Sequence, residues 1–226
     1  MATQLRMKVR RSNWFSSGVA IIGKVRLITC LALLLPLIFL SKAILEKKHF
    51  EFDPAFLEWL HTINEPLLTH FLEPFYTIGD TQFAAIIVVI SLGVLVWRRY
   101  WQEAKVLAIA SLGVLLLVDK VFKPFFHRRR PPMRLDDTAA GFSFPSGHAT
   151  GNFVLYLFLA YILAHRFPQY AVYIYSLTIV FLILMGLSSM YLRVHWPTDI
   201  IGGYGYGFIW LTFCLTLLKL SSKKYK

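Results

Sequence analysis

Long apolar runs, separated by polar segments, account for nearly half of this chain of 226 residues. A helix that crosses a bilayer needs about 20 mostly apolar residues, and six stretches reach or approach that length. These stretches are residues 27–45, 83–97, 106–122, 150–163, 171–192 and 200–218. The pattern predicts an all-α polytopic membrane protein with six transmembrane helices.

The composition agrees with this interpretation and argues against an ordinary soluble domain, because 57% of the residues are hydrophobic and only 16% are charged. The first apolar run follows a basic stretch and is long enough to remain as a span, so we expect no cleaved signal peptide. The sequence contains no internal repeat and no low-complexity tract. We therefore expect residues 1–226 to form a single integral membrane domain.

The distribution of basic residues predicts how the chain is oriented in the membrane. With six spans both termini lie on one side, and that side collects more of the 24 Lys and Arg residues than the other. The positive-inside rule then predicts cytoplasmic termini and fits a bacterial inner membrane. The net charge of +12 does not indicate a nucleic-acid partner, since the basic residues are spread over the loops that flank the spans.

Two segments outside the spans carry aromatic residues typical of the membrane surface. Residues 1–25 mix Arg and Lys with apolar side chains, and we expect either a cytoplasmic amphipathic helix on an anionic leaflet or a frayed tail. In residues 46–66 the pair Asp53-Pro54 is typical of a helix start. This segment predicts an interfacial helix between the first and second spans, on the side opposite the termini.

Three polar runs lie at the ends of apolar stretches, at residues 123–131 (KPFFHRRRP), 145–148 (PSGH) and 195–199 (HWPTD). Ionisable residues at such places in membrane proteins usually have a function. The runs belong to loops that we place at 120–148 and 189–199, and with six spans these loops emerge on the same face. Several prolines and a glycine between residues 122 and 145 predict an irregular connection.

The second run predicts an anion site at a helix start. Pro145 precedes small residues and then an apolar run, so the backbone amides of the first turn face the loop. Gly147 allows close approach of a ligand to the backbone, and Ser146 adds a hydroxyl donor. Alone, this segment is more typical of a capped helix beside an incidental histidine, His148.

The first run adds cations that match a phosphoryl group. Lys123 supplies a point charge, and Arg130 supplies a planar fork just before Pro131. We expect Arg128 and Arg129, by contrast, to be solvated or to contact lipid headgroups.

The third run contributes a nucleophile and its partner. Pro197 fits the first helical turn of the last span, so His195 projects from the preceding loop and Asp199 lies in the first turn. The Asp199 carboxylate can accept a proton from one imidazole nitrogen and leave the other nitrogen free to attack phosphorus. His148 would then protonate the leaving oxygen, and the cations would stabilise the transferring group. The scheme requires neither a metal nor another cofactor, and Cys30 and Cys214 lie in apolar segments without a partner at metal-ligand spacing.

Together these runs resemble the type 2 phosphatidic acid phosphatase family, whose motifs are K-x6-R-P, P-S-G-H and S-R-x5-H-x3-D. The first two match fully, and further likeness covers residues 52–59 (FDPAFLEW), 77–80 (TIGD) and 186–203. The resemblance implies six membrane helices, a metal-independent lipid phosphatase site on the extracytoplasmic face, and a phosphohistidine on His195.

The third motif departs from the family at one position, where Ser189 stands in place of the arginine. Arg193 follows four residues later, and residues spaced i and i+4 share a helix face. We therefore expect Arg193 either to bind the same phosphate oxygens or to contact lipid headgroups and solvent.

The sequence predicts a phosphatase that acts at the outer leaflet on phosphatidylglycerol phosphate, phosphatidic acid or undecaprenyl diphosphate. One alternative is a phosphotransferase, in which another hydroxyl takes the phosphoryl group from the same intermediate. A second is a catalytically impaired lipid-phosphate binder, suggested by Ser189. The expected partners are the lipid substrate and the bilayer, and no feature indicates an obligate protein partner.

Overall fold

The computed structural model describes residues 23–48, 50–63, 66–132, 134–135 and 141–223, and within these ranges every regular element is a helix. The segment 1–22 lies outside the described residues, and with it nearly all of the predicted N-terminal helix or tail. The elements are α2 (Lys24–Leu45), α3 (Phe52–Thr62), α4 (Pro66–Gly79), α5 (Thr81–Trp97), α6 (Trp101–Leu115), η1 (Leu116–Phe122), α7 (Lys123–Phe126), α8 (Gly147–Arg166), η2 (Pro168–Tyr170), α9 (Ala171–Tyr191) and α10 (Pro197–Lys223).

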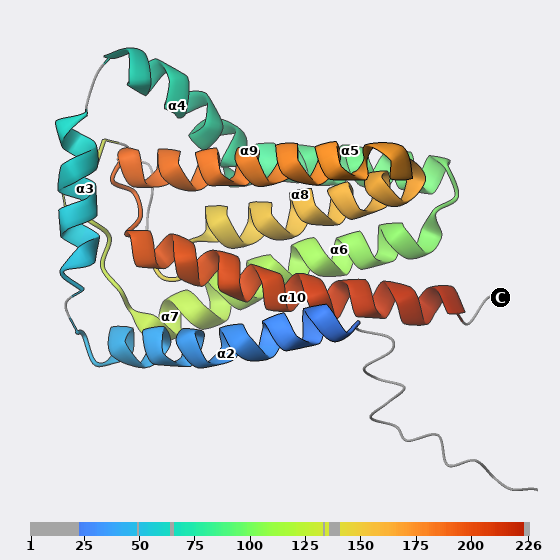
Figure 1. Ribbon diagram of the computed structural model, residues 1–226, viewed down its shortest axis with the longest axis horizontal. Helices are drawn as coiled ribbons and strands as arrows, with labels where there is room; N and C mark the ends of the chain where they lie inside the picture. The colour runs from blue at the N-terminus through green and yellow to red at the C-terminus, as the bar shows by residue number, and fades with distance from the viewer. Residues whose placement is uncertain (1–22, 49, 64–65, 133, 136–140, 224–226) are drawn as a thin grey trace, which may run out of the picture.

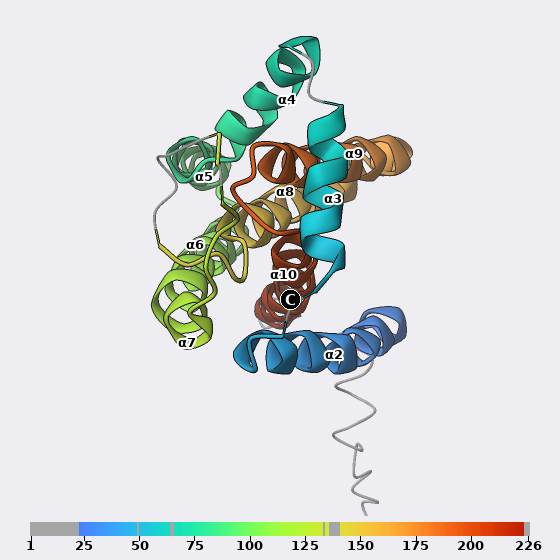
Figure 2. The same cartoon turned by 90° about the vertical axis from the view of Figure 1, so that its left-hand side faces the viewer.

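The long helices form a bundle in which α8 is central. Figures 1 and 2 show α5, α6, α9 and α10 around α8, with α2 at the outside against α10. The largest apolar core lies between α6, α8 and α10, where Leu107, Phe158 and Cys214 are completely buried. Gly203 allows α10 to approach α8 closely, since a Cβ atom there would lie 2.8 Å from the Cβ atom of Ala149.

The outer faces of the bundle remain apolar. Large side chains such as Phe39 on α2 and Val172 on α9 are more than 70% exposed. Many exposed large apolar side chains fit contact with lipid rather than water. Four of the described helices, those at 24–45, 147–166, 168–191 and 197–221, are long and apolar enough to cross a membrane, or five if the bent pair α4–α5 is one span.

The remaining predicted spans correspond to helices that are shorter as single elements. Helix α5 has 17 residues and α6 has 15, but the helical backbone continues from α6 through the π-helical turn η1 into α7. The structure therefore extends the helix to Phe126, beyond the predicted start of the loop. Pro124 lies in the first turn of α7, directly after the π-helical segment η1. A proline is tolerated in the first turn of a helix, where its missing N–H costs least.

Helices α3 and α4 lie outside the parallel bundle. Helix α3 crosses one end of it, and α4 leads back to α5 at an angle of 55° (Figures 1 and 2). The sequence pattern predicted a helix near α3 but none at α4. At the end covered by α3, helices α8 and α10 begin and α7 and α9 end, whereas α10 ends at the opposite end (Figure 1). The three polar runs are thus brought to one end of the bundle, as the order of the spans predicted.

Candidate active site

The start of α8 is organised by Ser146. Its side chain is completely buried, and its hydroxyl accepts a hydrogen bond of 3.2 Å from the backbone N–H of Ala149, as an N-cap residue does. The backbone N–H of Ser146 donates to the carbonyl oxygen of Asp199, which joins the second polar run to the third. The side chain of Ser146 therefore caps the helix, although it does not line the adjoining cavity, and its contact with phosphate stays a prediction.

Lys123 approaches this helix start from α7. Its Nζ atom lies close to Gly147, since a Cβ atom built there would be 3.5 Å away, at ordinary van der Waals contact. The same Nζ atom donates to Oδ1 of Asp119 at 2.7 Å. Both Lys123 and Gly147 line the cavity described below.

His195 lies in the connection between α9 and α10 and is buried together with Asp199. Its Nδ1 atom lies 3.4 Å from Oδ2 of Asp199, a close ion-pair distance but longer than a charge-assisted hydrogen bond. The backbone N–H of Trp196 donates to the same carboxylate oxygen at 2.9 Å. This loop geometry fixes the Asp199 carboxylate against one side of the imidazole.

The other side of the imidazole faces Arg130. Nε2 of His195 lies 3.2 Å from Nη1 of Arg130, and that guanidinium also donates to the carbonyl oxygens of Val194 and Gly141. In the tautomer that carries its proton on Nδ1, the lone pair of Nε2 points toward Arg130. A potential nucleophile therefore lies beside a cation suited to phosphate oxygens.

Burial is the largest influence on the acidity of His195 and lowers the pKa of its imidazole from the ordinary value of 6.5. The charges of Arg130 and Lys123 act in the same direction, whereas Asp199 opposes them. The imidazole is therefore neutral at neutral pH, which is the form that can act as a nucleophile.

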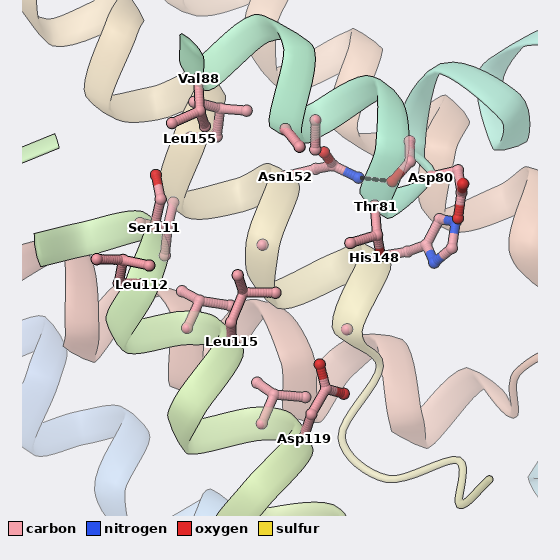
Figure 3. Close-up of a pocket in the computed structure, with 18 of the residues that line it drawn as sticks. Asp80, Thr81, Val88, Ser111, Leu112, Leu115, Asp119, His148, Asn152 and Leu155 are labelled. Carbon is pink, nitrogen blue, oxygen red and sulfur yellow. Dashed lines mark hydrogen bonds and ion pairs between the residues drawn. The ribbon is translucent and has the colours of Figure 1, made fainter. Parts of the chain in front are cut away.

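His148 approaches the site from the first turn of α8. Its ring stacks on Tyr76 at a centroid distance of 4.8 Å and an interplanar angle of 6°. Its Nε2 atom lies 3.9 Å from Oδ1 of Asp80 and is buried without a hydrogen-bond partner among the described residues. Figure 3 shows His148 facing the α4–α5 junction, where Asp80 caps α5.

These groups meet at one end of a cavity of about 530 Å³. Its polar residues include Asp80, Lys123, Arg130, His148 and His195. The rest of its wall is largely apolar and comes from α5, α6, η1 and α8, with residues such as Val88, Leu112 and Leu155 (Figure 3). One continuous space therefore combines a charged end with an apolar interior, as a headgroup with an attached hydrocarbon chain would require.

The sequence reasoning missed Tyr76 and Asp80 as parts of this site. Both lie at the α4–α5 junction, where the side-chain amide of Asn152 also donates to the carbonyl oxygen of Gly79 at 2.7 Å. The likeness over residues 77–80 was a usable signal, but nothing local to that segment indicated a neighbour on α8.

The expectation for Arg128 was wrong. Its side chain is only 15% exposed, and it donates hydrogen bonds of 2.5 Å to Asp53 on α3 and to Asp199 on α10. Burial of both acids explains this pairing, because an unpaired buried carboxylate is costly. The side chain of Arg129 is exposed, as predicted.

The structure does not bring Arg193 into the cavity. Helix α9 ends at Tyr191, so Arg193 is not on a helix face with Ser189 and instead has a φ of 54°. Ser189 is buried, and its hydroxyl donates to the carbonyl oxygen of Met185 at 3.0 Å. The cations that line the cavity within the described residues are Lys123 and Arg130.

We expect the substitution Arg193→Gly to leave the rate of phosphate release within about twofold of that of the unchanged protein. Glycine adopts a positive φ freely, whereas other residues pay about 1 kcal/mol there, so the loop should keep its shape. Initial rates with a lipid phosphate measure the effect. A loss of tenfold or more would restore Arg193 as a phosphate ligand.

The comparison with known proteins matches the part of the chain that carries these site residues. A family model described as the PAP2 superfamily matches residues 104–223, which include all three polar runs. The chain is 30% identical over 161 residues to phosphatidylglycerophosphatase B of Bacillus subtilis, covering 70% of this chain and 78% of that protein. It is 31% identical over 164 residues to the lipid A 4'-phosphatase of Porphyromonas gingivalis, covering 66% of each chain.

Solved structures agree in fold. The crystal structure of a transmembrane PAP2-type phosphatidylglycerolphosphate phosphatase from Bacillus subtilis matches with a TM-score of 0.73 and 28% identity, covering 88% of this chain and 98% of that one. The structure of Aquifex aeolicus LpxE matches with a TM-score of 0.57 and 26% identity, covering 74% and 96%.

Proposed function

Because this chain belongs to the PAP2 superfamily and is a multi-pass membrane lipid phosphatase, we propose that it hydrolyses a phosphomonoester or diphosphate headgroup through a phosphohistidine on His195. The observation that carries the proposal is the position of Nε2 of His195, 3.2 Å from Arg130 at the charged end of a largely apolar cavity. The cavity supports a substrate whose phosphate meets the cations while a hydrocarbon chain lies against α5, α6 and α8.

In the first step Nε2 of His195 attacks phosphorus, and the bond from phosphorus to the leaving oxygen breaks. His148 gives its proton to that oxygen, so the leaving group departs as a neutral hydroxyl in the case of an alcohol. Asp199 stabilises the positive charge that develops on the His195 ring. Lys123, Arg130 and the first backbone amides of α8 stabilise the negative charge on the equatorial oxygens, while Ser146 holds that helix end in place.

In the second step water attacks the phosphorus of the phosphohistidine, and His148 accepts the proton that water loses. The bond from phosphorus to Nε2 breaks, and inorganic phosphate leaves with the site restored. A lipid or sugar hydroxyl in place of water would make the same protein a phosphotransferase, and product analysis with added alcohols separates the two.

The relatives supply the candidate substrates. Phosphatidylglycerol phosphate and a 4'-phosphorylated lipid A follow from the names of the relatives, and phosphatidic acid and undecaprenyl diphosphate share the same headgroup chemistry. We place the site on the extracytoplasmic face, with cytoplasmic termini and α3 as an interfacial helix. In this topology α5 and the continuous helix α6–η1–α7 complete six spans.

Purified protein is expected to release inorganic phosphate from at least one of these lipids, and excess EDTA is expected to leave the rate unchanged. Lys123 and Arg130 supply the positive charge that a metal would otherwise provide. Within the described residues no group of three His, Cys, Asp or Glu side chains is arranged to hold a metal ion. Release that EDTA abolishes would contradict the mechanism, and no release from any lipid would favour a binding protein.

The pH dependence of the rate should reflect the lowered pKa of His195. The nucleophile is fully neutral above its ordinary pKa of 6.5 and loses activity only as the pH falls through the lower value in the folded protein. The acidic limb of kcat/KM, which reports the protein without bound substrate, should therefore lie below 6.5. A midpoint of that limb above 6.5 would argue against a buried neutral His195 as the nucleophile.

A further inference from the structure

One largely buried cation at the active site, Arg128, has no role in the chemistry described above. Arg128 lies two residues from Arg130, but it does not line the cavity and points instead behind Asp199. Its Nη1 atom donates to Oδ1 of Asp199 at 2.5 Å, while the other carboxylate oxygen of Asp199 faces Nδ1 of His195 at 3.4 Å. Arg128 and His195 therefore hold opposite oxygens of one carboxylate.

A second carboxylate, that of Asp53 on α3, also binds Arg128. Nη2 of Arg128 donates to Oδ2 of Asp53 at 2.5 Å, and Asp53 is 3% exposed. Thr198 connects the two, because its backbone N–H donates to Oδ1 of Asp53 at 3.0 Å and its hydroxyl donates to Oδ2 at 2.6 Å. The helix that crosses the end of the bundle is thus hydrogen-bonded to the first turn of α10, one residue before Asp199.

The surroundings of Arg128 suit a planar guanidinium. Its Cζ atom lies 5.8 Å from the ring centroid of Phe50 and 5.8 Å from that of Trp196. Nη1 also donates to the hydroxyl of Thr198 at 2.7 Å, so one group serves three partners. A lysine ammonium cannot reproduce this fork, even though it carries the same charge.

We propose that Arg128 is a positioning residue, which holds the Asp199 carboxylate against His195 and is itself held by Asp53 of α3. The inference rests on the proposed role of His195 as nucleophile. It couples α3, which lies outside the bundle, to the group that forms the covalent intermediate.

Removal of Arg128 should lower kcat more than it weakens phosphate binding. We expect Arg128→Met to reduce kcat about a hundredfold, as loss of a supporting hydrogen bond behind a reacting group does. The inhibition constant of inorganic phosphate should stay within about threefold, since Lys123 and Arg130 remain. Arg129→Met makes the same chemical change at the neighbouring exposed arginine and should leave both values unchanged.

The acidic limb of kcat/KM should also move in Arg128→Met. The charged groups that face His195 are Asp199, Arg130 and Lys123, with His148 across the site. Without Arg128, the full charge of Asp199 acts on the imidazole, so the limb shifts to higher pH. A loss of folding alone would lower the yield of active protein but would leave the limb where it is.

The buried carboxylates that Arg128 leaves behind repel each other and can impair folding. The double variant Arg128→Met with Asp53→Asn removes one of these charges, so it should recover thermal stability in detergent while kcat remains low. Arg128→Lys should also remain well below the original kcat. Recovery of full kcat in either variant, or full kcat in Arg128→Met itself, would overturn the inference. If instead a His195 variant kept full activity, the proposed function itself would fail.

Discussion

Replacing His195 with Asn is expected to reduce the rate of phosphate release by about 10⁴-fold or more. The side chain of Asn fills part of the space of the imidazole, but its amide nitrogen has no lone pair that can attack phosphorus. The covalent step is therefore lost, and only binding at Lys123 and Arg130 remains. Initial rates with an active lipid substrate measure the loss.

Trapping of the intermediate gives this test a second readout. Substrate labelled in its phosphate should transfer label to the unchanged protein, in a form stable to alkali and labile to acid, and should not label His195→Asn. His127→Asn is a matched control, since His127 is exposed and its positive φ of 50° suits Asn. This control should retain activity and labelling. Label that persists in His195→Asn would assign the nucleophile to another residue.

Replacing Arg130 with Met is expected to lower kcat by about 10²-fold to 10³-fold, the usual loss for one group that stabilises charge in the transition state. In the proposed mechanism the contribution of Arg130 is larger than in a family member with the complete third motif, because Ser189 supplies no cation. Its Nη1 atom also lies 3.2 Å from the proposed nucleophile. Steady-state rates over a range of substrate concentrations separate this loss from a change in KM.

Arg130→Lys provides a graded comparison. It keeps the charge and loses the fork, so it should recover part of the rate but remain at least about tenfold below the original. Arg129→Met again controls for loss of a basic residue from this loop. A fully active Arg130→Met would mean that Lys123 alone neutralises the phosphate, and the proposed arrangement of the site would then be wrong.

Local features of the fold were predictable because their causes are local. Long apolar runs indicated helices in lipid, and the segment around residue 146 indicated a helix start, since both depend on nearby residues. The segment at α4 was missed, although Pro66 and spaced apolar residues were available signals. The extension to Phe126 was missed because Pro124 was taken to end the helix, whereas the π turn η1 accommodates it.

The site predictions were correct where two partners lie close together in the sequence, and they missed partners that lie far apart. His195 and Asp199 are four residues apart, and their pairing followed from loop and helix geometry. The partners of Arg128 are 75 and 71 residues away, so no local pattern distinguished it from the exposed Arg129. The helix-face argument for Arg193 was wrong, since helix α9 ends at Tyr191, two residues before it.

The sequence by itself determined the membrane class, the helical fold and the residues available for phosphoryl transfer, because hydrophobic length and residue chemistry are properties of short segments. Only the tertiary structure decided which cation faces His195, which acid lies near His148, and which arginine holds Asp199. Those pairings depend on how α3, α4 and the loop before α8 pack at the end of the bundle. A charged side chain that is buried in this packing needs a partner of opposite charge or a hydrogen-bond partner, and that partner can come from a distant part of the sequence.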